Sequence, residues 1–406
     1  MHARLLALIA AMLCSHCSPT PFLMAGDKGA HFKARPLALI QDMDSGPLKD
    51  KLSSCEDVSL RRSDMVIGHR GAPLFYPEHT RESYIAAANS GAGILECDVT
   101  FTSDKALVCR HSQCDLHTTT DILNSPELAA KCEIPFTPAD PINGIPAQVK
   151  CCTSDITLAE FKTLRGKMDG FSPMATTPQA YMQGPEQGHQ LRGTLMTHAE
   201  SIELFKQLGV KMTPELKAAQ VAMPYQGFSQ ADYAAALIKE YQAAGVPASD
   251  VYPQSFNPQD VLFWIKHTPE FGQQTVILDG RDKDPTFNIN EPTTWQPDHN
   301  SLKSMGINII APPLWMLLSV DDQGRLVASE YANRARAAGL DIIAWTVERS
   351  GSLAEGGGWY YQGLDSAIDN DGDVMQVIDT LIRDVGVIGI FSDWPATVSY
   401  YQNCLR

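Results

Sequence analysis

The sequence predicts an α/β fold in which a parallel sheet closes into a barrel. Two observations carry this prediction: apolar strand-like runs recur between residues 65 and 391, and helix-like stretches separate most of them. Strands that alternate with helices favour a parallel sheet, and eight such units make a barrel. A doubly wound open sheet is the alternative, but no G-x-G-x-x-G fingerprint follows the first strand.

Nine segments have strand character, one more than the barrel requires, so we expect one of them to be a hairpin strand or not a strand at all. In chain order they are Met65–Gly68, Ile94–Thr100, Leu107–Cys109, Lys211–Leu216, Val251–Phe256, Thr275–Leu278, Ile307–Ala311, Asp341–Val347 and Val387–Phe391. The expected helices are Glu82–Asn89, Leu158–Leu164, Ala199–Leu208, Tyr233–Ala244, Ala328–Ala338 and Asp373–Asp384.

Charge and composition narrow the function classes. Lys and Arg number 32 against 47 Asp and Glu, for a formal net charge of −15, and 44% of the residues are hydrophobic. The apolar share argues against a disordered chain. The acidic balance argues against nucleic acid or an anionic membrane as a partner. We therefore expect a small-molecule substrate, and an anionic one would need local Arg, Lys or metal. The sequence leaves the oligomeric state open.

The N-terminus has the features of a secretory signal. His2 and Arg4 precede the apolar run Leu5–Cys14, which is as long as a signal-peptide core and too short to span a bilayer. Small residues near Ala25 place the expected cleavage there, so residues 1–25 are predicted to be a signal peptide and residues 26–62 an N-terminal extension. No later segment is long and apolar enough for a membrane span, so we expect export to a periplasm or to the extracellular space.

Cysteine usage agrees with export. Eight cysteines follow the predicted signal, and an even number in an exported chain indicates disulfides. Spacing does not reveal their connectivity, but five of them lie within Cys109–Cys152, so we expect at least one pair there, with Cys114–Cys132 as the first guess. The C-x-x-C spacings of a zinc site are absent. The eight are Cys55, Cys97, Cys109, Cys114, Cys132, Cys151, Cys152 and Cys404.

An irregular segment interrupts the strand–helix alternation. Residues 112–156 are rich in Cys, Pro, Thr and Asp and show no clear period, so we expect a small Cys-rich insertion held by disulfides. The stretch Gly170–Gly193, rich in Pro, Gly and Gln, is expected to form a loop. Asp115 and His117 lie inside the insertion, where we expect both to face solvent.

Glu96 and Asp98 stand two residues apart on an apolar strand, so their side chains share one face. If that face lines the barrel interior, a divalent cation would offset the repulsion between two buried carboxylates. Glu215, at the end of another strand, could add a third carboxylate, and oxygen ligands suit Ca²⁺ or Mg²⁺. Cys97 points to the opposite face, where we expect a buried thiol. Two exposed acids on an amphipathic strand are the alternative.

Two histidines, His69 and His111, follow strand-like runs, and each has an arginine beside it. Histidine can take or give a proton near neutral pH. Arg70 can bind a phosphate in a bidentate manner, and Lys217 adds a positive charge. Taken singly, such histidines are more often structural. Together with three acids at strand ends, where barrel enzymes place their catalytic groups, they indicate a phosphodiester site.

The order of these motifs resembles the signature of glycerophosphodiester phosphodiesterases over about residues 64–398. The matching segments are Val66-Ile67-Gly68-His69-Arg70-Gly71-Ala72, Pro77-Glu78-His79-Thr80, Glu96-x-Asp98, Thr102-x-Asp104, Val108-x-x-His111, Thr157–Phe161, Glu215-Leu216-Lys217, Ser255-Phe256, Trp345-Thr346-Val347 and Ser392-Asp393-Trp394-Pro395. His79 stands where many members of that family have Asn, a variant that exported members also show.

The resemblance implies a TIM (β/α)8 barrel over residues 63–400, one divalent cation, Ca²⁺ or Mg²⁺, and an insertion after the second catalytic histidine. The implied site residues are catalytic His69 and His111, substrate-binding Arg70 and Lys217, metal-binding Glu96, Asp98 and Glu215, and supporting Glu78 and Trp345. The expected activity is metal-dependent hydrolysis of glycerophosphodiesters to glycerol phosphate and an alcohol. We expect His69 to accept a proton from the nucleophile, which is either water or the glycerol 2-hydroxyl with a cyclic intermediate, and His111 to donate one to the leaving alcohol.

Three other functions fit parts of the sequence. A phospholipase D-like enzyme acting on sphingolipid or lysolipid is the main alternative, although such enzymes match Glu215-x-Lys217 less well. A non-catalytic surface barrel is disfavoured because both histidines and all three acids are present. A glycoside hydrolase would need carboxylates on either side of a sugar, whereas Glu96 and Asp98 share one strand face.

Overall fold

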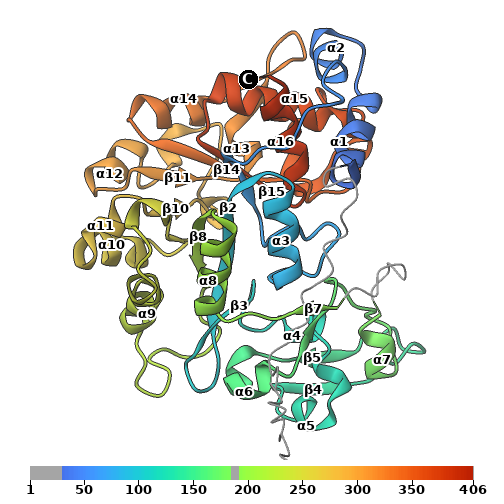
Figure 1. The fold of residues 1–406 in the computed structure, drawn as a ribbon, viewed down its shortest axis with the longest axis vertical. Coiled ribbons are helices and arrows are strands. Elements are labelled where there is room, and N and C mark those ends of the chain that lie inside the picture. Colours follow the sequence, from blue (N-terminus) through green and yellow to red (C-terminus); the bar gives the residue numbers. More distant parts are fainter. Residues whose placement is uncertain (1–29, 184–191, 406) are drawn as a thin grey trace, which may run out of the picture.

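The centre of the molecule is a closed barrel of eight parallel strands, which confirms the predicted TIM-type fold (Figure 1). The structure, a computed structural model, describes residues 30–183 and 192–405, and the predicted signal peptide lies outside this part of the chain. Around the barrel the strands are β1 (Ser63–Gly68), β2 (Ala92–Phe101), β8 (Lys211–Leu216), β9 (Gln254–Ser255), β10 (Val276–Leu278), β11 (Ile309–Ala311), β14 (Asp341–Val347) and β15 (Gly389–Ser392), which pairs with β1.

Helices follow the barrel strands and surround them. The main ones are α3 (Arg81–Asn89), α8 (His198–Leu208), α9 (Gln230–Ala243), α10 (Pro258–His267), α12 (His299–Ser304), α14 (Glu330–Ala337), α15 (Val374–Thr380) and α16 (Pro395–Cys404). Local sequence fixes where several of them begin: Thr197 and Ser229 accept hydrogen bonds from the backbone N–H of Glu200 and Asp232 at the starts of α8 and α9. Shorter elements complete the outer layer: α11 (Pro269–Gly272), α13 (Leu314–Leu317), β12 (Leu318–Val320) and β13 (Leu326–Ala328).

The nine expected strand segments all contain strands. The ninth is β3 (Leu107–Cys109), which pairs antiparallel with β2 so that Cys109 lies opposite Val99. It is therefore the hairpin strand, outside the ring of eight. The six expected helices are also present, although α6 (Leu158–Phe161) is a single turn and α15 ends at Thr380 in a π-helical turn.

The alternation of side chains along β2 sets the orientation of the acids. Ile94 belongs to the apolar cluster inside the barrel, whereas Cys97 packs in the larger core between strands and helices. Because side chains two residues apart share a face, Glu96 and Asp98 point into the barrel as Ile94 does, but lie nearer the carboxyl end of the strand. The interior cluster below them consists of Ile67, Ile94, Val276, Leu278, Ile309, Ala311, Ile343 and Phe391.

Residues between β3 and α8 form a lobe at one end of the barrel (Figure 1). Its elements are α4 (Leu116–Thr119), α5 (Pro126–Ala129), β4 (Ile134–Thr137), β5 (Gln148–Lys150), α6, β6 (Arg165–Gly166), α7 (Pro178–Tyr181) and β7 (Gly193–Thr194). A second buried apolar cluster, which includes Leu116, Ile122, Phe161 and Tyr181, holds them together. Short helices and hairpins thus replace the irregular chain that the composition indicated. Residues 184–191 of the expected loop lie outside the described residues.

Four disulfides join the eight cysteines of residues 30–183 and 192–405, and they fit an exported protein. The expectation of a pair within Cys109–Cys152 is confirmed, but the Cys114–Cys132 guess is wrong: the bonds are Cys114–Cys152 and Cys132–Cys151. The β4–β5 hairpin explains this pairing because it places Lys150 opposite Ile134 and so returns the chain to Cys132.

The expectation of a buried thiol at Cys97 is confirmed for the burial and wrong for the thiol. Cys97 does lie on the outward face of β2 and is fully buried, but it is bonded to Cys109. The antiparallel register of β2 and β3 places Val99 opposite Cys109, which leaves Cys97 diagonally adjacent on the neighbouring strand. The bond therefore fixes the strand that leads to His111.

The N-terminal extension packs on the last helix of the barrel. It contains α1 (Ala30–Asp42) and α2 (Pro47–Ser53), and α1 contacts α16. The Trp394 indole donates to the Phe32 carbonyl at 3.2 Å, and Cys55 is bonded to Cys404. Among the described residues, none of the helices has the length and apolar character needed to cross a membrane.

The disulfide pairing within the lobe can be tested by single substitutions. Cys114→Ser should leave Cys152 as the free thiol, and Cys132→Ser should leave Cys151 free, because each change removes one partner of a bond. Alkylation of unreduced protein followed by peptide mass spectrometry identifies the free cysteine. Labelling of Cys132 in the Cys114→Ser variant would contradict the observed pairing and restore the sequence-based guess.

Candidate active site

Closure of the barrel places His69 beside Asp393. The pairing of β1 with β15 sets Gly68 opposite Ser392, so the next residue of each strand lies at the same rim. The Nδ1 atom of His69 lies 2.5 Å from one oxygen of Asp393, and Arg349 donates to the other oxygen at 2.8 Å. Burial by itself would raise the pKa of Asp393, but Arg349 and His69 hold it below its usual range. Asp393 is therefore a fixed carboxylate that orients the imidazole.

The three predicted metal ligands converge next to this pair. The parallel register of β2 and β8 sets Asp98 opposite Glu215, with Glu96 two residues earlier on the same face. One carboxylate oxygen from each of the three lies within 4.8 Å of the others, and all three residues are buried. The Oδ1 atom of Asp98 has no hydrogen-bond partner among the described residues. An unpaired buried carboxylate oxygen facing two other carboxylates is the arrangement that a cation would complete.

The electrostatics of this acid cluster (Glu96, Asp98 and Glu215) point to the same conclusion. Burial, followed by the charges of Asp98 and Glu215, raises the pKa of Glu96 well above its usual value. Burial and Asp98 also raise the pKa of Glu215 to about 7, although Lys217 opposes the rise. Three carboxylates cannot all ionise at this spacing without a compensating charge. Their oxygen donors fit a hard divalent cation such as Ca²⁺ or Mg²⁺.

Neighbouring groups orient the acids. The Arg70 backbone N–H donates to one oxygen of Glu96 at 2.9 Å, and the Gln254 amide donates to the other at 2.8 Å. His79 Nε2 lies 2.9 Å from Asp98 Oδ2. These contacts fix the orientation of the Glu96 and Asp98 carboxylates, so the geometry of the cluster is set before a ligand binds.

The turn after β1 adopts an unusual backbone. Arg70 and His79 both have φ of 55°, and the His79 N–H donates to the Arg70 carbonyl at 3.0 Å. Gly71, at φ 94°, has no room for a side chain because a Cβ would lie 2.4 Å from the Ser83 hydroxyl. Left-handed conformations at non-glycine residues cost free energy and cluster at functional sites. Here the turn aims the Arg70 N–H at Glu96.

Basic side chains complete the rim. Arg70 and Arg110 bind opposite oxygens of the buried Glu78, at 2.9 and 3.4 Å. Lys217 lies 2.7 Å from Glu215, and the Nε atom of Arg70 has no hydrogen-bond partner among the described residues. Glu78 therefore holds two guanidinium groups beside the acid cluster and leaves part of Arg70 available to an anion.

His111 follows β3 and is half-buried at the same rim. Burial, followed by the charges of Arg70 and Lys217, lowers the pKa of His111 well below its usual value. Within the part of the chain that the structure describes, no side chain hydrogen-bonds its ring. His69 and His111 thus differ: the first ring is fixed by a carboxylate, and the second is free to meet a ligand.

Trp345 lies on the other side of the barrel mouth. Its indole donates to the Ala311 carbonyl at 2.7 Å, and its ring packs on the apolar cluster inside the barrel. It contacts none of the acids in the hydrogen-bond or ion-pair networks of the described residues. Its neighbours are aromatic.

Sequence reasoning missed several residues of the site. It gave no role to Asp393, Arg349, Gln254 or Arg110, and it discounted His79, which contacts Asp98. Ser392-Asp393 was part of the matched motif, and the closure of a barrel would have placed it next to His69. Asp115 was expected to face solvent, which is wrong: it is buried and lies 3.4 Å from the Arg110 Nε. His117 is half-buried and accepts from the Cys151 N–H at 3.3 Å.

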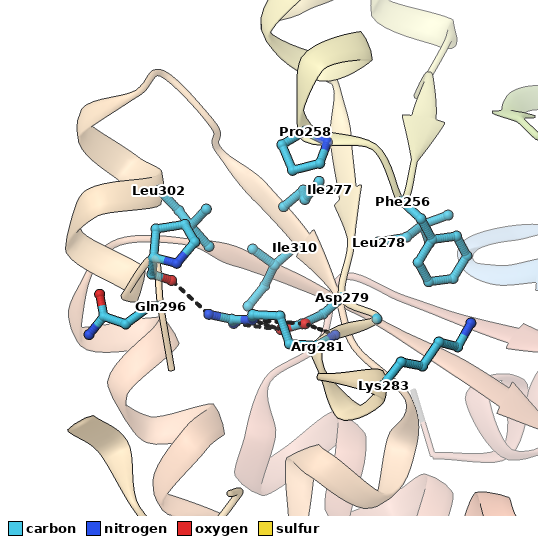
Figure 2. Close-up of a pocket in the computed structure, with 12 residues that line it drawn as sticks. Phe256, Pro258, Ile277, Leu278, Asp279, Arg281, Lys283, Gln296, Leu302 and Ile310 are labelled. Carbon is cyan, nitrogen blue, oxygen red and sulfur yellow. Dashed lines mark hydrogen bonds and ion pairs between the residues drawn. The ribbon is translucent and has the colours of Figure 1, made fainter. Parts of the chain in front are cut away.

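A pocket of about 330 Å³ lies beside the barrel rather than over the acids (Figure 2). It is lined by residues of β10, β11 and α12 and of the segments that follow β9 and β10. Arg281 crosses it and donates to Asp279 and to the Pro297 carbonyl, both at 2.6 Å, so its charge is already paired. The apolar lining comes from Phe256, Pro258, Ile277, Leu278, Leu302 and Ile310.

The rim combines cationic side chains that could bind a phosphate, carboxylates that could hold a metal, and imidazoles that could transfer protons, a set suited to hydrolysis of a phosphoric diester. Residues 69–397 match the Glycerophosphoryl diester phosphodiesterase family. The chain belongs to this family, whose members are phosphoric diester hydrolases that generally depend on a divalent cation.

Similar proteins agree with this assignment. A protein from Arthroderma benhamiae, named "Extracellular protein", is 42% identical over 248 residues, which cover 59% of this chain and 100% of that protein. Glycerophosphodiester phosphodiesterase GDPD6 from Arabidopsis thaliana is 28% identical over 147 residues, 36% of each chain. A Silicibacter pomeroyi crystal structure assigned to the glycerophosphoryl diester phosphodiesterases superposes with a TM-score of 0.55 and 19% identity, over 84% of this chain and 94% of that one. The last likeness supports the fold.

The contact between Asp393 and His69 makes a testable prediction. Asp393→Asn should lower kcat by about 10²- to 10⁴-fold with little change in KM, because the amide no longer fixes the imidazole tautomer. Asp341→Asn, an exposed position at the amino end of β14, is the matched control and should keep full activity. Steady-state kinetics on both variants decides the matter; equal kcat values would contradict a positioning role for Asp393.

Proposed function

We propose that this protein hydrolyses glycerophosphodiesters to glycerol phosphate and an alcohol, with one Ca²⁺ or Mg²⁺ held by Glu96, Asp98 and Glu215. One observation carries the proposal: the carboxylate oxygens of these residues lie within 4.8 Å of one another in a buried site, with Lys217 2.7 Å from Glu215. When bound, the cation supplies positive charge that neutralises the phosphate and polarises its oxygens. Membership of the family supports the substrate class.

Arg70 and Lys217 are proposed to bind the phosphate. The Arg70 guanidinium is held by Glu78 at 2.9 Å, and its Nε, which lies 3.8 Å from Asp98 Oδ2, has no hydrogen-bond partner among the described residues. A phosphate at the rim would give that atom a charge-assisted hydrogen bond without changing the Arg70–Glu78 pair. Lys217 would add a second positive charge from β8.

His69 is proposed to accept the proton of the nucleophile. Asp393 accepts the hydrogen bond of Nδ1, so the lone pair of the neutral ring is on Nε2, which lies 3.9 Å from Glu96 on the side of the acid cluster. Burial lowers the pKa of His69 to about 4, so the ring is neutral at physiological pH and can take a proton. The negative charge of Asp393 stabilises the imidazolium that then forms.

His111 is proposed to donate a proton to the leaving alcohol. Burial, followed by the charges of Arg70 and Lys217, disfavours its protonated form in the free protein. A bound phosphate diester brings negative charge to the same place and would raise the pKa of His111 toward the range where it can donate. The ring has no competing hydrogen bond from a described side chain, so it can turn toward the ester oxygen.

Export is proposed on two grounds. The four disulfides persist in oxidising compartments. The relative from Arthroderma benhamiae carries the name "Extracellular protein". We propose the same location for this chain, with residues 1–25 as its signal peptide.

Metal removal tests the core of this proposal. Exhaustive treatment with EDTA should abolish hydrolysis of a panel of glycerophosphodiesters, and added Ca²⁺ or Mg²⁺ should restore it. Asp98→Asn should weaken metal binding by about 100-fold without unfolding, and Asp341→Asn should not. Calorimetric metal titration and a glycerol phosphate assay provide the readouts. Full activity after chelation would remove the metal from the mechanism, and activity on lysolipid alone would favour the phospholipase D-like alternative.

A good leaving group separates the roles of the histidines. His69→Ala and His111→Ala should each lower kcat on the native substrate by about 10²- to 10⁴-fold. A nitrophenyl diester needs little protonation of its leaving group, so it should restore His111→Ala far more than His69→Ala. The opposite pattern in the same kinetic assay would exchange the two roles, and full activity of either variant on native substrate would contradict the pair.

A further inference from the structure

The rim of the barrel has two chemically different halves. The ends of β15, β1, β2 and β8 carry the charged groups described above. The ends of β9, β11 and β14 and the loops after them carry five aromatic rings instead. We call this set the aromatic wall, and its members are Phe256, Trp315, Trp345, Trp359 and Tyr360.

The rings of the aromatic wall brace one another. Trp345 and Trp359 are stacked, with centroids 5.6 Å apart and planes 27° from parallel. Tyr360 meets the two indoles edge-on at 6.1 and 5.1 Å, and Phe256 meets Trp345 edge-on at 5.9 Å. The hydrogen bond from Trp345 to Ala311 anchors the set to β11. Such a surface is rigid before a ligand arrives, so little conformational entropy is lost on binding.

The wall is open to solvent although it is aromatic. Trp359 is 43% exposed and Phe256 is 39% exposed, and the other three rings are half-buried. Several large rings exposed together, beside an enzyme site, mark a place where a ligand binds. The other exposed large apolar residues of the described chain, such as Ile142 in the lobe, include no Trp.

The wall adjoins the charged half of the rim directly. Trp345 is four residues before Arg349, which donates to Asp393. Trp345 also packs on the interior apolar cluster that contains Phe391, whose ring meets His69 edge-on with the centroids 5.9 Å apart. A phosphate diester held by Arg70 therefore has one of its two alcohol groups on the side of the wall.

The wall already attracts a cation within the molecule. The Lys283 ammonium lies 5.4 Å from the centroid of the Phe256 ring, in the geometry of a cation–π contact. Among cations, a quaternary ammonium is the easiest to take from water onto aromatic faces, because it has no N–H groups to leave unpaired. The net charge of −15 also favours a cationic group over an anionic one.

We propose that the aromatic wall is a subsite for a trimethylammonium head group, which makes glycerophosphocholine the preferred substrate class of this protein. The proposal rests on the proposed function, because it assigns the alcohol side of the same reaction. The phosphate binds at Arg70 and Lys217, and the choline moiety lies against Trp345, Trp359 and Phe256.

A neutral isostere of choline provides the test. The 3,3-dimethylbutyl ester of glycerol phosphate has the shape of glycerophosphocholine without its charge. The wild-type protein should show a higher kcat/KM for the choline diester, and the ratio of the two values measures recognition of the cation. Trp359→Leu should lower this ratio about 3- to 30-fold, the range that cation–π contacts span. Trp359→Phe should keep most of it.

Matched controls separate the possible outcomes. Phe171→Leu removes a 41%-exposed ring in the lobe and should leave the ratio unchanged. Phe256→Leu is a second wall variant for the case in which Trp359→Leu does not fold. Equal kcat/KM values for choline diester and isostere would overturn this proposal while leaving the proposed function intact. A preference for the lysolipid over the deacylated diester would assign the wall to an acyl chain and also overturn it. Hydrolysis of none of these diesters would instead remove the proposed function itself.

Discussion

Three carboxylates buried within 4.8 Å of one another are the constraint on which the rest of the site depends. Burial of like charges is unfavourable, so the groups around them are arranged to compensate. Backbone and amide donors from Arg70 and Gln254 fix Glu96, and His79 fixes Asp98. Lys217 supplies charge, and Glu78 in turn keeps Arg70 close.

These compensating groups come from strands that are far apart in the sequence. Only a closed barrel brings the ends of β15, β1, β2 and β8 to one rim, and only the in-register pairing of β2 with β8 sets Asp98 opposite Glu215. The turn after β1 adds a strained backbone at Arg70 and His79, which the packed surroundings maintain. Many small contacts, rather than one strong interaction, therefore offset the free-energy cost of burying the acid cluster.

Local periodicity explains why much of this was predictable. Alternation along a strand was enough to place Glu96 and Asp98 on one face, and the apolar runs located the nine strands. The contact between His69 and Asp393 was not predictable in that way, because it depends on which strands meet when the barrel closes. Helix α16 escaped notice for a different reason: eight of its ten residues are buried, so it has no polar face to produce an amphipathic pattern. Apart from α6, the helices of the lobe were not predicted because each of them is only one turn long.

The bond between Cys55 and Cys404 affects how the protein would respond to a proteolytic cut. It links residues 349 positions apart and so encloses the whole barrel, its acids and its lobe in one covalent ring. A protease that cuts any single loop between those cysteines produces two fragments that remain one molecule, each held against the other at the base of α16. The severed strands stay at high effective concentration and can keep their pairing. A barrel cut at one loop therefore loses a peptide bond, but its two fragments stay joined.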